Sequence, residues 1–255
     1  MTQLLISVKN VAEALLAFEA GVDIIDLKDP NVGALGALSV LETTQIIQAI
    51  NEQKTIGLNA PNLTRISTTV GEQHIDLNNL ISEIQARYVL GVDLIKIAVS
   101  ELFYTKHFLN QMQPLTRNGM QLIAVFFADK PIDLALLVTL KKIGFFGAML
   151  DTQIKQQSLL QAQTANELQM FTQKCHENDL QSGLAGSIQP QHIENLIQLN
   201  PTYIGFRGGA CENLVRQNNL CRTKVIEIKK LLHTYNKINV KPQKSKHLAC
   251  IVNVV

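Results

Sequence analysis

The sequence predicts an α/β fold, a TIM (β/α)8 barrel in a single domain, and three observations support this prediction. Eight apolar runs each precede a stretch with helical periodicity, and the connections between them are short. The runs are continuously apolar rather than alternating, which is typical of parallel strands covered on both faces. The length of 255 residues, 46% of them hydrophobic, suits a barrel of this kind. A doubly wound sheet is the alternative, but it usually has fewer strands and one glycine-rich switch point.

The first four strand–helix units are marked by strand-like runs and by signals that start or stop helices. Asn10 suits the N-cap of the first helix, and Gly21 and Gly91 follow the first and third helices, where glycine commonly ends a helix. We expect strands at residues 4–8, 23–28, 65–70 and 93–99. We expect the helices that follow them at residues 11–20, 39–50, 77–90 and 101–117.

The last four units follow the same rules. Gly119 stops the fourth helix, Pro131 stands where a helix tolerates proline, and Gly144 closes the helix that begins there. We expect strands at residues 121–127, 147–150, 181–185 and 202–206. We expect helices at residues 131–144, 167–179, 192–199 and 223–234.

Composition and charge exclude several classes of protein. The formal net charge of +2 gives no reason to expect nucleic acid or an anionic membrane as a partner. The four cysteines form neither a CxxC pair nor a zinc-ligand spacing, which suits a reducing compartment. The longest apolar stretch, residues 132–150, is interrupted by charges and is no membrane span. With no charged leader ahead of the first strand, we expect a cytoplasmic protein that acts on a small molecule.

The second expected strand carries two charges in an apolar run. Because residues two apart in a strand point to the same face, Ile24, Asp26 and Lys28 share one face, while Ile25 and Leu27 share the other. Burying either charge without a partner is costly. An internal ion pair with a structural role is one interpretation. A reactive lysine at the end of a barrel is the other.

Further charges follow the other expected strands. The stretch GVDLIKIAV echoes GVDIIDLKD and places Lys96 inside the fourth strand. The fifth strand leads to Asp129, and the sixth leads to Asp151 with Lys155 four residues later. The carboxyl ends of barrel strands form one rim, which is where active sites of this fold lie. We therefore expect three lysines and three aspartates to converge there, an arrangement hard to explain by structure alone.

Crowded lysines have a specific chemical use. Burial and neighbouring cations disfavour the charged form of a lysine and lower its pKa. The neutral amine can then attack a carbonyl to form a Schiff base, and a carboxylate or a second lysine can move the proton. The six histidines are scattered, and most lie in expected helices or the C-terminal tail. We therefore expect no metal site.

The loops after the seventh and eighth strands are glycine-rich and suit a phosphate group. They contain Gly186 and Ser187 in one loop and Arg207, Gly208 and Gly209 in the other. In barrels, these two loops often bind phosphate through backbone amides, and an arginine adds a charge-assisted contact. Ordinary glycine-rich turns are the alternative.

The sequence also resembles the family of (5-formylfuran-3-yl)methyl phosphate synthases, also called 4-(hydroxymethyl)-2-furancarboxaldehyde-phosphate synthases. The resemblance extends from about residue 4 to residue 232 and is carried by the stretches DIIDLKDPNVGALGA, TVGE, GVDLIKIAV, AMLDTQIK, LAGSI and GFRGGAC. It implies a TIM barrel that condenses two molecules of glyceraldehyde 3-phosphate into a furan phosphate, the furan precursor of methanofuran and related C1 carriers. The implied reaction loses phosphate and water and needs no cofactor.

The resemblance also implies roles for individual residues. The Schiff-base lysine falls on Lys28, its companion aspartate on Asp26, and a proton donor and acceptor on Lys96. The DT-x-x-K element supplies Asp151 and Lys155. The phosphate loops fall on Gly186, Ser187, Arg207, Gly208 and Gly209. Residues 156–158 and 53–64 depart from the family pattern.

The boundaries and the function leave alternatives open. We expect a catalytic barrel at residues 1–235 and a C-terminal extension at residues 236–255, which lies outside the resemblance. The extension could be an edge strand, a partner contact or a disordered tail. The sequence leaves open a homo-oligomer, another Schiff-base aldolase acting on a small phosphosugar, and a sugar-phosphate-binding barrel without turnover.

Overall fold

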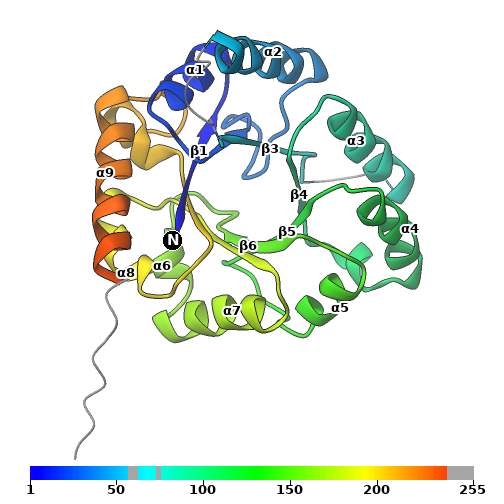
Figure 1. The fold of residues 1–255 in the computed structure, drawn as a ribbon. Helices are drawn as coiled ribbons and strands as arrows, with labels where there is room; N and C mark the ends of the chain where they lie inside the picture. The colour runs from blue at the N-terminus through cyan, green and yellow to red at the C-terminus, as the bar shows by residue number, and fades with distance from the viewer. Residues whose placement is uncertain (57–62, 73–75, 240–255) are drawn as a thin grey trace, which may run out of the picture.

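In the computed structural model, which describes residues 1–56, 63–72 and 76–239, eight parallel strands close into a barrel in chain order (Figure 1). The last strand pairs with the first, so the sheet has no free edge. The barrel of the predicted fold class is therefore confirmed, and a doubly wound sheet is excluded. The strands are β1 (Gln3–Val8), β2 (Ile24–Leu27), β3 (Arg65–Thr69), β4 (Leu94–Ala98), β5 (Leu122–Phe127), β6 (Gly147–Asp151), β7 (Gln181–Leu184) and β8 (Tyr203–Phe206).

Helices surround the barrel and cover the outer face of the sheet (Figure 1). The α-helices are α1 (Val11–Glu19), α2 (Val40–Ile56), α3 (Leu77–Val89), α4 (Lys106–Arg117), α5 (Leu136–Lys142), α6 (Leu159–Ala162), α7 (Ala165–Glu177), α8 (Ile193–Ile197) and α9 (Arg222–Asn239). Short 3-10 helices are η1 (Glu101–Tyr104), η2 (Pro190–His192), η3 (Gly208–Ala210) and η4 (Glu212–Leu214). Within the described residues, no helix is both long and apolar enough to cross a membrane.

The two faces of the strands belong to two separate cores. Ile25 and Leu27 of β2 point outward and pack in the large core between strands and helices. Ile24, two residues before Asp26, points inward and belongs to a smaller core inside the barrel. The predicted division of the second strand into two faces is therefore confirmed. The inner core also contains Leu5, Leu94, Ile123, Met149 and Tyr203.

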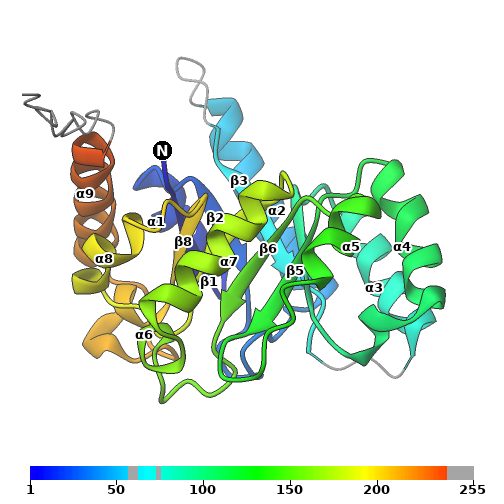
Figure 2. The same ribbon diagram turned by 90° about the horizontal axis from the view of Figure 1, so that it is seen from below.

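A layer of large side chains fills the barrel near the ends where its strands begin. The ring of Tyr203 lies over Gly183, and a Cβ atom on that glycine would stand 2.4 Å from the ring. Only glycine leaves enough space at this position of β7. Because barrel interiors are packed in layers, the inner core closes the axis at this end. Figure 2 shows that the chain begins at this end and that the strand arrows point away from it.

Several helices differ from the expected boundaries. Helix α2 ends at Ile56 rather than at residue 50, and α4 begins at Lys106 rather than at residue 101, because η1 precedes it. Helix α5 begins at Leu136 rather than at residue 131, because Asp133 accepts a hydrogen bond from the Ala135 backbone N–H at 2.9 Å and forms a turn before the helix. The short helix α6 was not expected from the sequence. Its N-cap, Ser158, forms a capping box with Gln161. The helix that follows this signal has only four residues.

The last helix also continues past the expected boundary at residue 235. The Asn236 side chain accepts a hydrogen bond from the Thr2 backbone N–H at 2.9 Å and donates one to the Thr2 carbonyl at 2.8 Å. These bonds attach the end of α9 to the start of β1, so residues 236–239 belong to the barrel. Most of the expected extension, residues 240–255, lies outside the described residues. The same is true of residues 57–62, which are part of the long segment at 53–64.

Candidate active site

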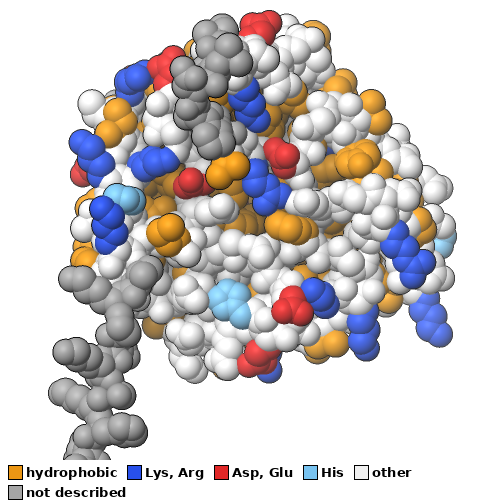
Figure 3. Space-filling view, in the orientation of Figure 1, with side chains coloured by type: hydrophobic (Ala, Val, Ile, Leu, Met, Phe, Trp, Pro, Cys, Tyr) orange, Lys and Arg blue, Asp and Glu red, His pale blue; other side chains and the backbone are white. Residues whose placement is uncertain are grey.

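A pocket of about 520 Å³ opens at the carboxyl ends of the strands. All five residues to which the resemblance assigns catalytic roles line it, namely Asp26, Lys28, Lys96, Asp151 and Lys155. The five come from β2, β4 and β6 or the loops that follow them, so strands far apart in the sequence bring them together. Figure 3 views the opposite end of the barrel, where charged side chains of both signs are interspersed with apolar and polar ones.

The deepest charged groups are Asp26 and Lys96, which we call the inner pair. Their Oδ1 and Nζ atoms lie 2.5 Å apart, and both side chains are almost fully buried. Ser67 and Ser7 also donate hydrogen bonds to the Asp26 carboxylate, at 2.7 and 2.9 Å. Burial raises the pKa of Asp26, but the charges of Lys96 and Lys28 outweigh it and hold the pKa below its ordinary value.

Lys96 has the opposite balance. Burial lowers the pKa of Lys96 and the charge of Lys28 lowers it further, while Asp26 opposes the change. The result is a pKa below the ordinary value of a lysine. An amine with a lowered pKa releases and regains a proton more readily near neutral pH, which is the property that a proton-transfer group needs.

Above the inner pair, Asp151 lies between two lysines, and we call Lys28, Asp151 and Lys155 the outer cluster. Lys28 Nζ lies 3.2 Å from Asp151 Oδ2, and Lys155 Nζ lies 2.6 Å from Asp151 Oδ1. The Thr152 backbone N–H also donates to Asp151 Oδ1, at 2.8 Å. Burial raises the pKa of Asp151, but the charges of Lys155 and Lys28 outweigh it, so the pKa lies well below the ordinary value.

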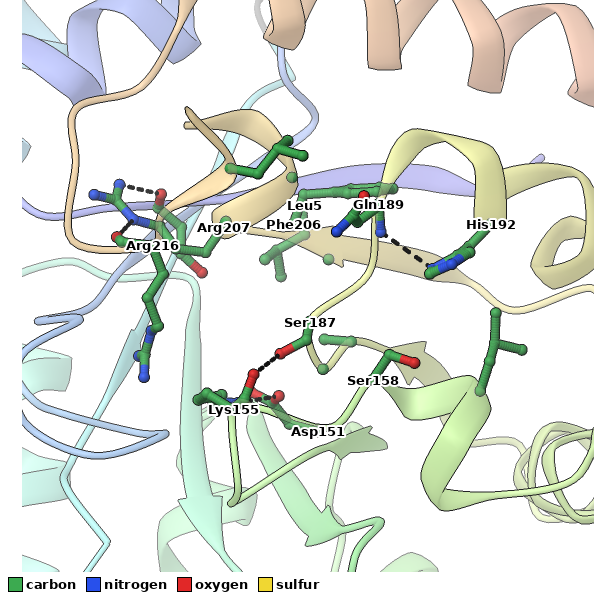
Figure 4. Close-up of a pocket in the computed structure, with 18 of the residues that line it drawn as sticks. Leu5, Asp151, Lys155, Ser158, Ser187, Gln189, His192, Phe206, Arg207 and Arg216 are labelled. Atoms are coloured by element: carbon green, nitrogen blue, oxygen red, sulfur yellow. Dashed lines mark hydrogen bonds and ion pairs between the residues drawn. The ribbon is translucent and has the colours of Figure 1, made fainter. Parts of the chain in front are cut away.

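Lys155 is the most exposed amine of the outer cluster. Burial lowers its pKa most, Asp151 opposes this, and the charge of Lys28 lowers it again, to about 8. Besides Asp151, its Nζ donates to the Thr152 carbonyl. Ser187 Oγ donates to the Lys155 carbonyl at 2.8 Å and ties the loop after β6 to the loop after β7 (Figure 4).

Asp129 reaches the rim with the other two expected aspartates, but it does not line the pocket. Its carboxylate accepts hydrogen bonds from the backbone N–H groups of Gln153 and Ile154, at 2.9 and 2.6 Å. The side chain therefore fixes the loop that carries Lys155. The sequence could not show this, because the loop's path decides which backbone amides face the carboxylate.

The two glycine-rich loops form one side of the pocket. Gly186, Ser187, Gly208 and Gly209 all line it. Gly186 has a φ of +115°, and a Cβ atom there would stand 2.8 Å from the Thr152 backbone nitrogen, so glycine is required. Within the part of the chain that the structure describes, the backbone N–H groups of Gly186 and Ser187 donate to no protein acceptor. Unpaired amides of this kind suit an anion.

Arg207 lines the pocket, but its guanidinium is already occupied. It donates to both Glu13 carboxylate oxygens, and to the carbonyls of Ser7, Arg216 and Asn218. Since a guanidinium has five N–H groups, this set uses all of them. In this arrangement no N–H group of Arg207 is left for the expected phosphate contact. Sequence reasoning missed Glu13, which lies almost 200 positions earlier, and it missed Arg216, the second arginine of the same loop.

Among residues 1–56, 63–72 and 76–239, no three His, Cys, Asp or Glu side chains form a group that could hold a metal ion. The pocket lining offers amines, carboxylates, guanidinium groups, hydroxyls, side-chain amides and the imidazole of His192.

Comparisons with known proteins identify similar sequences and similar folds. The 4-HFC-P synthase family model matches residues 4–229. A Methylorubrum extorquens protein, named provisionally as a (5-formylfuran-3-yl)methyl phosphate synthase, is 35% identical over 88% of this chain and 89% of its own. Two further relatives are named (5-formylfuran-3-yl)methyl phosphate synthase. The protein from Methanocaldococcus jannaschii is 30% identical over 89% of this chain and 98% of its own. The protein from Archaeoglobus fulgidus is 29% identical over 91% of this chain and 99% of its own.

Solved structures match the fold alone. The 3-hexulose-6-phosphate synthase of Salmonella typhimurium superposes with a TM-score of 0.62 and 14% identity, over 92% of this chain and 100% of its own. KGPDC from Streptococcus mutans superposes with a TM-score of 0.59 and 9% identity, over 92% of this chain and 99% of its own. At these identities the likeness supports the barrel and carries no statement about substrate.

Proposed function

This chain belongs to the 4-HFC-P synthase family, and on that premise we propose that it condenses two molecules of glyceraldehyde 3-phosphate into (5-formylfuran-3-yl)methyl phosphate. The curated relatives named as synthases of this compound support the product. The reaction releases phosphate and water, with no net oxidation or reduction, so it is a lyase-type synthesis that requires no redox cofactor. The furan product would supply methanofuran-type carriers.

The observation that carries the proposal is the outer cluster standing directly above the inner pair. Binding alone does not require three amines and two carboxylates in one pocket, whereas imine chemistry requires both a nucleophile and groups that move protons. Lys28 is the best-placed nucleophile. Its Nζ makes one hydrogen bond in the described part of the structure, while Lys155 makes two and Lys96 is locked against Asp26.

The reaction would begin when Lys28 attacks the aldehyde of one triose phosphate and water leaves. The resulting iminium withdraws electrons from the neighbouring carbon, and Lys96, assisted by Asp26 and Asp151, moves protons as the enamine forms and phosphate departs. The enamine then attacks the second triose phosphate, and ring closure with loss of water forms the furan. Hydrolysis of the imine finally frees the Lys28 amine and gives the formyl group of the product. Lys155 holds the phosphate or the carbonyl of the second molecule. Gly186, Ser187, Gly208 and Gly209 hold a phosphate through the backbone.

The test combines borohydride trapping with a product assay. The unmodified protein is incubated with glyceraldehyde 3-phosphate and borohydride, and its peptides are analysed by mass spectrometry. We expect a reduced adduct on the peptide that contains Lys28. Lys28→Ala and Lys28→Arg should abolish both adduct and furan product while leaving the melting temperature near that of the unmodified protein, because neither supplies an amine that can form the imine at neutral pH.

The matched control is Lys142→Ala, which removes an exposed lysine of α5 and should change neither readout. Near-normal product formation by Lys28→Ala would eliminate the mechanism. Trapping at Lys28 with a different product would instead indicate another Schiff-base aldolase. Substrate binding without adduct or product would indicate a binding protein.

A further inference from the structure

Arg216, in the loop between β8 and α9, points into the pocket without a carboxylate of its own. Its side chain is half-buried and lines the pocket. Its Nη2 donates to the Gly33 carbonyl at 3.0 Å, and across residues 1–56, 63–72 and 76–239 the guanidinium makes no other hydrogen bond and no ion pair. Since an arginine has five N–H donors, most of them are available to a ligand.

The charges around Arg216 favour an anion as that ligand. Burial lowers the pKa of Arg216, and the carboxylates that oppose this are Asp151 first, then Glu72 and Asp29. Lys28 and Lys155 already share Asp151, and Glu72 accepts hydrogen bonds from the Leu35 backbone N–H and the Gln153 side chain. Burial lowers the pKa of Lys155, and the positive charges of Lys28 and Arg216 lower it further. Lys28, Lys155 and Arg216 thus gather on the side of the pocket where Asp151 lies, and Arg216 has no ion pair among the described residues. A half-buried cation without a counter-ion is costly, and a bound anion would remove that cost.

The loop holds Arg216 in a fixed place. Arg207 donates hydrogen bonds to the carbonyls of Arg216 and Asn218, both at 2.8 Å, and is itself paired with Glu13 at 2.5 Å. The loop also contains two consecutive left-handed residues, Asn213 and Leu214, with φ values of 54° and 60°. Leucine rarely adopts this conformation, and it persists only where the surroundings impose it. The cost is therefore borne in the loop that presents Arg216.

We propose that Arg216 binds the phosphate of the second triose phosphate, at a subsite separate from the glycine-rich loops. This inference rests on the proposed function, because a reaction between two phosphate-bearing molecules must hold two phosphates in one pocket. The glycine-rich loops provide one site. Figure 4 shows Arg216 and Ser187 on different sides of the open space, with Arg216 reaching toward the side of Lys155 and Asp151. A planar guanidinium suits bidentate binding of phosphate.

The experiment compares the half-reaction at Lys28 with the complete reaction. Arg216→Ala and Arg216→Lys are incubated with glyceraldehyde 3-phosphate, and both the borohydride-trapped adduct at Lys28 and the furan product are measured. We expect Arg216→Ala to form the adduct as the unmodified protein does, but to show a KM for product formation raised on the order of 10- to 100-fold. Arg216→Lys should recover part of this loss, because lysine keeps the charge without the fork.

The matched control is Arg222→Ala, an exposed arginine that pairs with Glu19 outside the pocket and should leave both readouts unchanged. Unchanged product formation and KM in Arg216→Ala would overturn this inference while leaving the Schiff-base proposal intact. Loss of the adduct in a folded Arg216→Ala protein would assign Arg216 to the first substrate and also overturn it. Absence of an adduct in the unmodified protein would instead overturn the proposed function.

Discussion

Asp151 is the residue on which the outer cluster depends. Its two oxygens accept one lysine each, and its backbone neighbour Thr152 adds a third hydrogen bond. Because both lysines are largely buried, the carboxylate offsets the cost of keeping two amines charged at one place. The arrangement places Lys28, the proposed nucleophile, and Lys155 on the two oxygens of one carboxylate. Protonation or deprotonation of either lysine therefore changes the pKa of the other.

Lys155 gives a pH dependence whose direction follows from its role. Its pKa is lowered to about 8, so the amine is mostly charged at pH 7 and mostly neutral at pH 9. If the charged form holds the second substrate, kcat/KM should fall as pH rises through about 8. In Lys155→Arg, which stays charged throughout, this fall should disappear, although activity is lower. A pH–rate profile of both proteins measures this, and a profile that rises through pH 8 would assign Lys155 to the base instead.

At the scale of single elements, helix ends carry part of the stability. Thr164 caps α7 by accepting a hydrogen bond from the Glu167 backbone N–H, while Glu167 reaches back to Thr164 in a capping box. The position is exposed and lies outside the pocket lining. Its contribution is therefore separable from that of the active site.

Thr164→Ala should lower the free energy of unfolding by about 1 kcal/mol, because loss of the cap leaves the Glu167 backbone N–H without a hydrogen-bond acceptor. Urea unfolding measures the change, and furan formation should stay the same. Thr234→Ala is the control. That exposed threonine lies within α9 and donates only to the Lys230 carbonyl, so its removal should cost little. Equal losses in both variants would contradict a role for the cap.

The elements also show where sequence reasoning succeeds. All eight strands could be predicted because each is a buried apolar run, and Asp26 and Lys96 could be identified because a charge stands out in such a run. Loops gave less. Arg207 lines the expected pocket, but its guanidinium forms an ion pair with Glu13. No local sequence pattern connects two residues from the first and last units of a barrel. Arg216 could not be identified from the sequence either, because only the folded loop brings it to the pocket.

At the scale of the whole molecule, the buried carboxylates predict how stability changes with acid. The pKa values of Asp26 and Asp151 in the folded protein lie below the ordinary value of 3.8. The unfolded chain therefore binds protons more readily below about pH 4. The stability that these groups contribute is present above that pH and is lost as pH falls through the folded values.

The free energy of unfolding should accordingly change little between pH 7 and 5 from these groups and fall steeply below about pH 4. Urea unfolding at a series of pH values measures this. Asp179→Asn, at an exposed surface pair with Lys141, should show the same curve as the unmodified protein. A gradual decline that begins near pH 6 would show that other groups control the acid transition.

The packed layer around Tyr203 and Gly183 has a consequence for the traffic of molecules. Because this layer closes the axis at one end of the barrel, reactants enter and products leave through the same opening. In the proposed reaction, the phosphate released from the first molecule must then pass the incoming second molecule or leave before it arrives. A pocket with a single opening favours an ordered reaction, in which phosphate leaves before the second substrate binds. Free phosphate in the medium would then compete with the second substrate for the pocket.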